Sequence, residues 1–470
     1  MADLFPLSRE AIGAIGLGLL FVLILLRIPV GLAMATVGLG GLAALSREAD
    51  IAQPAVVRFS AELSRFKYEM WSLFEGYDLS VIPLFVLMGY LAARGGLSRD
   101  LFNGFNALFG RRRGGVAIAA IGACAGFGAV SGSSLATAST MGQVALPELR
   151  RLSYDPALAT GVLAAGGTLG ILIPPSVVLV LYAIVVEASV LDMFRAALLP
   201  GLLAVALFIA TVMVLVRLRP EIAPLGPAMA PKAWRGAILR LLPVAAIFGL
   251  LIGGLAFGLF LPTPAAGVGA FAVLVYGLAV RWHTGDGLTW TGLRAAVLET
   301  AVTAGMIYFI LFGARMVGIF FARSNLPQAL ADLIVGSAFD PYLVLVAILV
   351  LFVVLGCVME SLSMVLVAVP FLWPVIQALN GGAAVLPADA AFGLSNADLQ
   401  IWFGILALVV VELGLITPPV GLNVFIIHAL ARDVPMSRTF RGVMPFFSVE
   451  IVRIALLVAV PSVALLLGRL

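Results

Sequence analysis

Two pairs of adjacent prolines, Pro174-Pro175 and Pro418-Pro419, lie inside long apolar segments and limit the possible folds more than any other feature. Proline lacks a backbone N–H and clashes with the preceding helical turn, so two in succession interrupt a helix. Hydrocarbon does not tolerate the freed backbone groups unless they face a protein interior or cavity. In an apolar chain, these pairs therefore predict broken helices that other helices enclose.

The composition places these pairs in a membrane protein. Of the 470 residues, 62% are hydrophobic and 11% are charged, and the mean hydropathy is +1.16. A soluble domain carries about 25% charged residues, so we expect a multi-pass membrane protein surrounded by lipid, without a sizeable soluble domain. The first apolar run, 12–26, has no small-residue cleavage site after it, so no removable signal peptide is expected. The sequence pI near 9.3 is assigned to loop arginines and not to nucleic-acid binding.

Several kinds of chemistry are disfavoured. The chain has no phosphate-binding loop of the G-x-x-x-x-G-K-[ST] type, no nucleophile elbow and no H-E-x-x-H motif. Its two cysteines, Cys124 and Cys357, lie in apolar runs, and its two histidines have no partner at metal-ligand spacing. We therefore predict no enzymatic activity, no cofactor and no transition metal.

Apolar segments cover nearly the whole chain, and a crossing helix needs roughly 20 residues. The candidate spans are 11–27, 29–45, 79–94, 155–187, 192–216, 236–258, 262–280, 294–319, 399–431 and 440–468. Two of them, 155–187 and 399–431, contain the proline pairs and are interpreted as broken helices. The segments 114–149 and 341–379 have polar centres and are interpreted as re-entrant hairpins, each made of two half-length helices. Residues 46–76, 97–110 and 326–336 are expected at the membrane surface.

The two halves resemble each other at a constant spacing. Gly89, Ser131 and Ser134 fall on Gly318, Glu360 and Ser363 at an offset of 229 residues. This predicts a first repeat over 1–216, a linker over 217–235 and a second repeat over 236–470. Arginine is concentrated in 94–113 and 217–240 but scarce in the partner loops, so the repeat is predicted to be inverted, with the linker and arginine-rich loops cytoplasmic. Five crossings per half place both termini outside, and the first hairpin opens from the cytoplasm and the second from outside. Matching breaks in two halves indicate a transporter.

The polar tip Ser131-Gly132-Ser133-Ser134 is the first candidate site. Helix N-termini and hydroxyls can bind a carboxylate, although small residues also allow close helix packing. Carbonyls freed at the proline pairs, with nearby threonine hydroxyls, suit a sodium ion. Half-helix C-termini bind sodium in this way in transporters.

Charged residues at membrane depth are functional candidates by default. Glu360 lies at the second tip, and Glu412 lies in the second broken helix. The alternative is a buried acid that pairs with an arginine or with backbone amides for structural reasons. Arg315 could pair with one of these acids, meet a substrate carboxylate or extend to the outer surface. Asn423 could be an ion ligand or a helix cap.

Three stretches resemble one family. They are Gly126–Ala138, Ala165–Ser176 and Leu413–Asn423, and they resemble the large membrane subunit of tripartite ATP-independent periplasmic (TRAP) transporters. The resemblance extends over essentially the whole chain. It implies a sodium-driven secondary transporter that imports an organic acid by an elevator movement across the bacterial inner membrane. The family also implies a small four-helix membrane subunit, expected as a separate chain, and a periplasmic binding protein that delivers the substrate.

Carried onto this chain, the resemblance implies one sodium site between the first tip and Gly166–Pro174, another between Gly356–Ser361 and Gly414–Pro418, and substrate between the tips. The candidate substrate-binding residues are Ser131, Gly132, Ser133, Ser134, Arg315, Glu360, Ser361 and Ser363. The candidate sodium-binding residues are Ser131, Gly166, Gly167, Thr168, Pro174, Gly356, Glu360, Gly414, Thr417, Pro418 and Asn423. Glu412 departs from the neutral residue often found in the family.

The predicted fold is thus an all-α membrane protein with inverted repeats, two hairpins and two broken helices, of the elevator type. The predicted function is the large permease subunit of a sodium-coupled importer of a C4-dicarboxylate or related carboxylate. Two alternatives stay open: a stand-alone ion-coupled dicarboxylate or anion carrier, and a membrane scaffold subunit that does not transport. The sequence does not identify the acid.

Overall fold

The computed structural model describes residues 8–49, 64, 66–73, 75–226, 231–337 and 339–468. Every regular element in these ranges is a helix, which confirms the all-α prediction. Eight helices of the described ranges are long and apolar enough to cross a membrane, or nine if the bent pair Pro156–Leu172 and Val177–Val186 forms one span. The chain divides into two compact units, and each unit takes residues from both sequence halves. The repeat boundaries stay a prediction.

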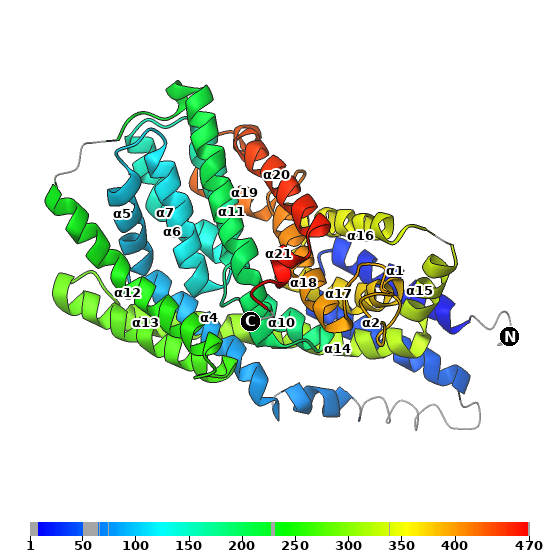
Figure 1. Ribbon diagram of the computed structural model, residues 1–470. Coiled ribbons are helices and arrows are strands. Elements are labelled where there is room, and N and C mark those ends of the chain that lie inside the picture. Colours follow the sequence, from blue (N-terminus) through cyan, green and yellow to red (C-terminus); the bar gives the residue numbers. More distant parts are fainter. Residues whose placement is uncertain are drawn as a thin grey trace. The chain divides into compact units, whose positions relative to one another are not determined.

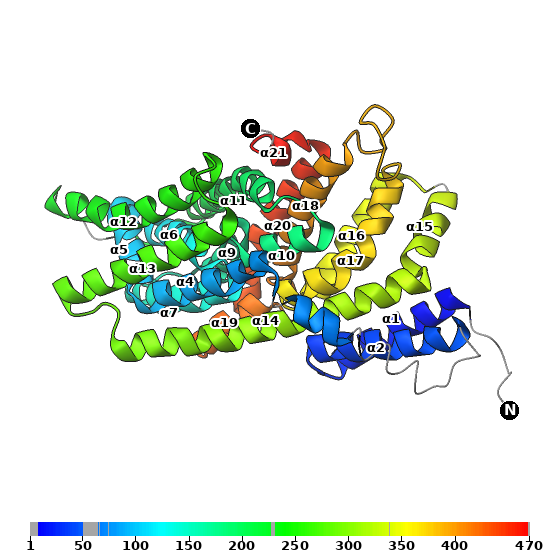
Figure 2. The same cartoon turned by 90° about the horizontal axis from the view of Figure 1, so that it is seen from below.

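Unit 1 comprises Met1–Leu79, Val302–Ile348 and Ser363–Gln400. In it, α1 (Arg9–Leu25) lies beside α2 (Val30–Ala49), and α15 (Leu326–Gly336) packs on α1 (Figure 2). The second part of α14 (Trp290–Ser324) and most of α17 (Ser361–Leu379) also belong here. The predicted surface segment 46–76 falls partly outside the described residues, and its described part at 66–73 is helical.

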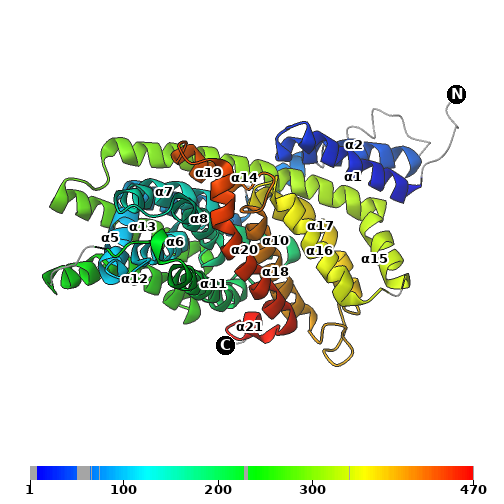
Figure 3. The ribbon, with the colours of Figure 1, turned by 90° about the horizontal axis from the view of Figure 1, so that it is seen from above.

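Unit 2 comprises Ser80–Ala301, Leu349–Leu362 and Ile401–Leu470 and contains both proline pairs and both tips. Its elements up to the linker are α4 (Val81–Arg94), α5 (Leu97–Phe109), α6 (Gly115–Ser131), α7 (Ser134–Arg151), α8 (Pro156–Gly167), α9 (Leu169–Leu172), α10 (Val177–Val186) and α11 (Val190–Leu218). After the linker come α12 (Pro231–Ala256), α13 (Pro262–Thr284), the end of α16 (Pro341–Gly356), most of α18 (Asn396–Gly414), α19 (Leu422–Leu430), α20 (Met436–Ala459) and α21 (Ser462–Leu465). Within the unit, α4 and α13 lie side by side (Figure 1), and α8 lies between α7 and α20 (Figure 3).

The segments 114–149 and 341–379 each form two helices that meet at a polar tip. The arms α6, α7, α16 and α17 contain 17, 18, 16 and 19 residues. At about 1.5 Å per residue, each arm is about 24–29 Å long, close to the roughly 30 Å of a bilayer core. The arms are thus longer than half a crossing, although their bounds agree with the predicted segments 114–149 and 341–379 within a few residues. Re-entry of these hairpins into the membrane stays a prediction.

The linker is shorter than predicted because helices enter it from both ends. Helix α11 continues to Leu218, and α12 begins at Pro231. Proline is favoured in the first helical turn, where its missing N–H costs nothing, so Pro231 begins a helix instead of extending the loop. A short 3₁₀ turn, Pro220–Ile222, lies between them.

Candidate functional site

Several polar side chains of the first tip form hydrogen bonds with neighbouring groups of the same hairpin. Gly132 joins α6 to α7 with φ at +60°, a left-handed conformation that glycine adopts without strain. Ser133 caps α7, because its Oγ accepts a hydrogen bond from the Ala136 N–H at 3.3 Å. The hydroxyls of Ser131 and Thr137 are hydrogen-bonded at 2.9 Å. The predicted tip is therefore present, and its serines hold the turn in shape.

The first tip lies directly on the first break. The break separates α9 from α10, contains the cis bond Pro174-Pro175 and ends at Ser176, whose Oγ accepts from the Leu179 N–H at 3.4 Å. A Cβ placed on Gly132 would be 3.1 Å from the Pro175 carbonyl oxygen. The structure thus brings the predicted first-site segments into backbone contact.

The second tip and the second break also meet. A Cβ on Gly414, the last residue of α18, would be 2.7 Å from the Gly356 Cα, so only glycine fits there. Beyond the cis bond Pro418-Pro419, the Gly421 N–H donates to the Cys357 carbonyl at 3.3 Å. Gly356 and Gly414, predicted for one sodium site, are therefore neighbours.

Two threonines near the breaks each donate their hydroxyl proton to a backbone carbonyl of the preceding helical turn. The Thr168 hydroxyl donates to the Ala165 carbonyl, and the Thr417 hydroxyl donates to the Leu413 carbonyl, both at 2.6 Å. A hydroxyl that gives its proton to a carbonyl still has lone pairs on its oxygen. Both side chains can therefore offer an oxygen to a cation.

Asn423 connects the two broken helices. It is fully buried near the start of α19, and its Nδ2 donates to the Ala164 carbonyl of α8 at 3.3 Å. Its Oδ1 is buried without a hydrogen-bond partner among the described residues. A buried amide oxygen without a donor is costly, and it suits a hard cation that binds oxygen ligands.

Glu412 is the acid that the predicted site residues omit. It is 1% exposed on α18, and its two carboxylate oxygens accept hydrogen bonds from Ser134 and from Ser361, the latter at 2.8 Å. These serines were predicted to bind substrate, but their hydroxyls are used by Glu412. The available signal was that Glu412 is the one acid of the apolar run 399–431.

A buried ion pair on α20 was also missed. Arg453 is 0% exposed and Glu450 is 2% exposed. The Arg453 guanidinium donates to the Glu450 carboxylate and, at 3.0 Å, to the Pro200 carbonyl of α11. The available signal was an acid and an arginine three residues apart, which share one helix face.

Other predicted residues have different surroundings. Arg315 belongs to unit 1, where its guanidinium donates to the Ser72 hydroxyl at 2.9 Å and lies 3.7 Å from the Glu69 carboxylate. Ser363 is buried and also belongs to unit 1. Glu360 is half-buried at the second tip and forms no ion pair within the described ranges. Their predicted roles in substrate binding stay predictions.

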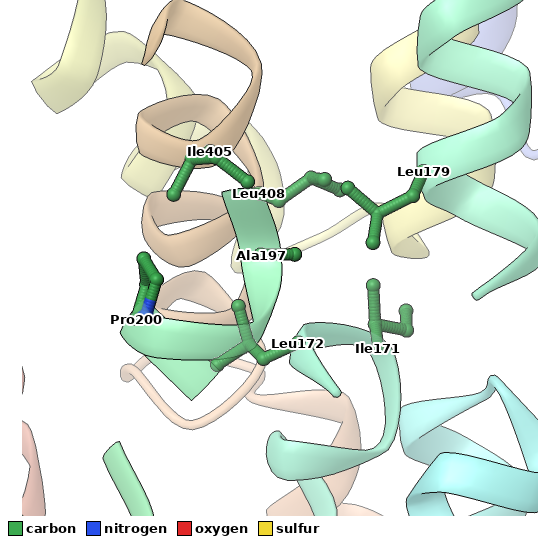
Figure 4. A pocket seen from close by; sticks show the side chains of 7 residues that line it. All are labelled: Ile171, Leu172, Leu179, Ala197, Pro200, Ile405 and Leu408. Atoms are coloured by element: carbon green, nitrogen blue, oxygen red, sulfur yellow. The ribbon is translucent and has the colours of Figure 1, made fainter. Parts of the chain in front are cut away.

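A small cavity in unit 2 does not have the chemistry of an acid-binding site. It lies among α9, α10, α11 and α18 and is lined only by apolar residues (Figure 4). They are Ile171, Leu172, Leu179, Ala197, Pro200, Ile405 and Leu408. No charged or hydroxyl side chain reaches it to bind a carboxylate.

Paired hairpins and broken helices with polar tips define a multi-pass membrane protein of the transporter class. Residues 17–463 match the family described as "Tripartite ATP-independent periplasmic transporter, DctM component". The chain belongs to this family and is a large permease subunit of the inner membrane, as the resemblance predicted.

Curated relatives agree with the family. The chain is 32% identical over 393 residues to the C4-dicarboxylate TRAP transporter large permease protein DctM of Pseudomonas aeruginosa, covering 84% of this chain and 86% of that protein. It is 32% identical over 399 residues to the sialic acid TRAP transporter large permease protein SiaM of Vibrio cholerae, covering 84% and 87%. Among solved structures, the YdaH transporter of Alcanivorax borkumensis has a similar fold, with a TM-score of 0.57, 16% identity and coverage of 85% and 88%.

Proposed function

We propose that this subunit couples the import of an organic acid to the inward movement of sodium. The observation that carries the proposal is Asn423, whose buried Oδ1 has no donor among the described residues and whose Nδ2 is bound to α8. The Thr168 and Thr417 oxygens beside the two breaks add ligands of the type that sodium prefers. Carbonyls at interrupted helices complete such sites in transporters.

The substrate class is a carboxylate. Two relatives are named for C4-dicarboxylate and for sialic acid transport. We propose that the acid binds near the tips, through Ser131, Ser133 and backbone amides. In this proposal Ser134 and Ser361 bind Glu412, to which their hydroxyls donate. Glu360 and Arg315 remain proposed members of the pocket.

The proposed partners are a small four-helix membrane subunit and a periplasmic binding protein. The family description names a tripartite system. The chain covers 86% and 87% of two relatives named large permease proteins, but only 58% of the isethionate TRAP transporter permease protein DctMQ of Oleidesulfovibrio alaskensis. A separate small subunit is part of the proposal. Movement of the tips as an elevator is part of the proposal.

The test is uptake of a panel of radiolabelled organic acids into liposomes that contain this chain and the small subunit, with the purified binding protein outside. Uptake should require both the binding protein and an inward sodium gradient. Uptake at the same rate with and without a sodium gradient would reject the coupling. Uptake without the binding protein would identify a stand-alone carrier.

The Asn423→Ala variant tests the sodium ligand. Loss of one oxygen ligand should raise the half-saturating sodium concentration roughly tenfold, which corresponds to about 1.4 kcal/mol. Asn380→Ala is the matched control, because Asn380 is also fully buried but both ends of its amide are hydrogen-bonded, to the Leu394 carbonyl and the Phe392 N–H. The control should lose stability without a change in sodium dependence. The same sodium dependence in both variants would remove Asn423 from the site.

A further inference from the structure

The Glu412 carboxylate contacts both hairpin tips at once. One oxygen accepts from Ser134, the first residue of α7, and the other accepts from Ser361, the first residue of α17. Each of the three side chains is 1% exposed. All three residues lie in unit 2. A single side chain thus joins segments that are 278 and 51 residues away from it in the sequence.

The polar groups around the Glu412 side chain come from the two tips. The first turns of α7 and α17 carry the partial positive charge of helix N-termini, which favours an anion. The nearby guanidinium of Arg453 is bound to Glu450 and to the Pro200 carbonyl, so it is not a direct partner of Glu412. The hydroxyls of Ser134 and Ser361 are therefore the groups that bind the Glu412 carboxyl group.

The hydrogen bonds also make the contact costly to lose. If the carboxylate were removed, two buried hydroxyls would be left without their acceptor, and unsatisfied buried polar groups are disfavoured. The Ser134 and Ser361 hydroxyls each bind one carboxyl oxygen of Glu412 directly. Hydrogen bonds are directional, so Glu412 constrains the positions of both tips.

We propose that Glu412 is a positioning residue that holds the first tip, Ser131–Ser134, and the second tip, Gly356–Ser361, at a fixed separation. With this separation fixed, ions and substrate bound at one tip can also contact the ligands of the other tip. That the tips bind ions and substrate rests on the proposed function. The fixed separation itself is a property of the protein that can be measured without transport.

The first test measures the distance between the tips by pulsed electron paramagnetic resonance. Spin labels are placed on cysteines at Gln143 of α7 and Val358 of the second tip, both exposed positions in unit 2. Cys124 and Cys357 are first replaced by serine. The full chain is assembled with its small subunit in lipid nanodiscs. The wild-type background should give one narrow distance distribution.

Two substitutions at one position separate hydrogen bonding from charge. Glu412→Leu removes both, and should widen the distribution at least about twofold because two hydrogen bonds are lost. Glu412→Gln removes the charge, but its amide oxygen can accept from one serine while its amide N–H donates to the other. The distribution for Glu412→Gln should therefore stay close to that of the parent.

A second variant keeps the proposal testable if Glu412→Leu fails to assemble. Ser134→Ala combined with Ser361→Ala retains Glu412 and removes both donors, and should widen the distribution in the same way. An assembled Glu412→Leu protein with an unchanged distribution would overturn the proposal. A distribution as wide in Glu412→Gln as in Glu412→Leu would also overturn it, because charge alone would then hold the tips.

Transport kinetics give an independent readout. Glu412→Leu should raise the substrate KM and the half-saturating sodium concentration together, each about tenfold, and Glu412→Gln should stay within about twofold of the wild type. A role in stability alone would lower the amount of assembled protein and leave both constants unchanged, which would overturn the proposal. If no acid is transported with sodium, the proposed function fails, while the distance measurement still decides the role of Glu412.

Discussion

The two proline-pair breaks have the same sequence motif but very different exposure. Pro174, Pro175 and Ser176 are all buried, whereas Pro418 and Pro419 are exposed and Thr417 is half-buried. The first break is covered by its own tip through the contact of Gly132 with Pro175. The second break is longer, running from the end of α18 at Gly414 to the start of α19 at Leu422. A motif thus determines where a helix breaks, while the surrounding elements determine whether the break is buried or exposed.

The two sequence halves also differ in buried charge. Among the described residues, the buried charged side chains are Glu412, Glu450 and Arg453, and all three come from the second half. The buried polar side chains of the first half include Ser131, Ser134 and Thr168, which are neutral. Similar backbone interruptions are therefore combined with neutral polar groups in one half and with charges in the other.

The largest expected effect comes from the buried ion pair, which has no charged counterpart in the first half. Arg453→Met leaves the Glu450 carboxylate buried and unpaired, which should cost about 3–5 kcal/mol of stability. Thermal unfolding of the purified protein measures the loss. Arg453→Met combined with Glu450→Gln should recover most of it, because no buried charge remains. A single variant as stable as the wild type would show that the second half does not depend on this pair.

A smaller effect is expected at the two threonines. Thr168→Val and Thr417→Val each remove one oxygen, worth about 0.5–1.5 kcal/mol, so the half-saturating sodium concentration should rise about two- to tenfold in uptake assays. The change should be larger for Thr168, because water can replace the lost oxygen more easily at the exposed second break.

Thr211→Val is the matched control for both threonines. Its hydroxyl makes the same intrahelical bond, to the Leu207 carbonyl at 2.8 Å, away from either break. Sodium dependence should not change in this variant. If it is also unchanged in both test variants, the threonines are not sodium ligands.

The substitutions with the smallest expected effect on uptake are single cysteines that test whether the two halves are inverted. Single cysteines at Arg112, between α5 and α6, and at Ser337, after α15, replace exposed residues in corresponding loops. An inverted repeat places them on opposite sides of the membrane, so a membrane-impermeant thiol reagent should label only one of them from outside. Uptake should be unaffected. Labelling of both from the same side would contradict the inversion.

Local features of the fold were predictable because they depend on nearby residues. The predicted span 79–94 corresponds to η1 (Tyr77–Ser80) with α4, and the predicted surface segment 97–110 corresponds to α5, within a few residues. The proline pairs fixed the breaks, because their missing N–H groups act on their own helix. The arms of both hairpins begin and end within a few residues of the predicted segments 114–149 and 341–379, since a polar tip locates the turn between two helices.

The partners of buried polar groups were not predictable. Ser134 and Ser361 were expected to face a substrate, and the structure pairs both with Glu412. Nothing in the sequence relates Ser134 to a residue 278 positions away. Arg315 was considered as a partner for an acid at membrane depth, and its partners in unit 1 are Ser72 and Glu69. A residue type predicts the kind of bond, and only the tertiary fold selects the partner.

Helix α14 has a consequence for the lipid in which this protein works. It is continuous over 35 residues (Figure 2), which corresponds to about 52 Å at 1.5 Å per residue. A bilayer core is about 30 Å thick, so this helix must tilt or extend its ends beyond the hydrocarbon. Trp290 at its first position is 78% exposed, and tryptophan favours the interface between hydrocarbon and headgroups. Bilayer thickness therefore acts directly on the angle of α14, and acyl-chain length becomes a variable that reconstitution can control.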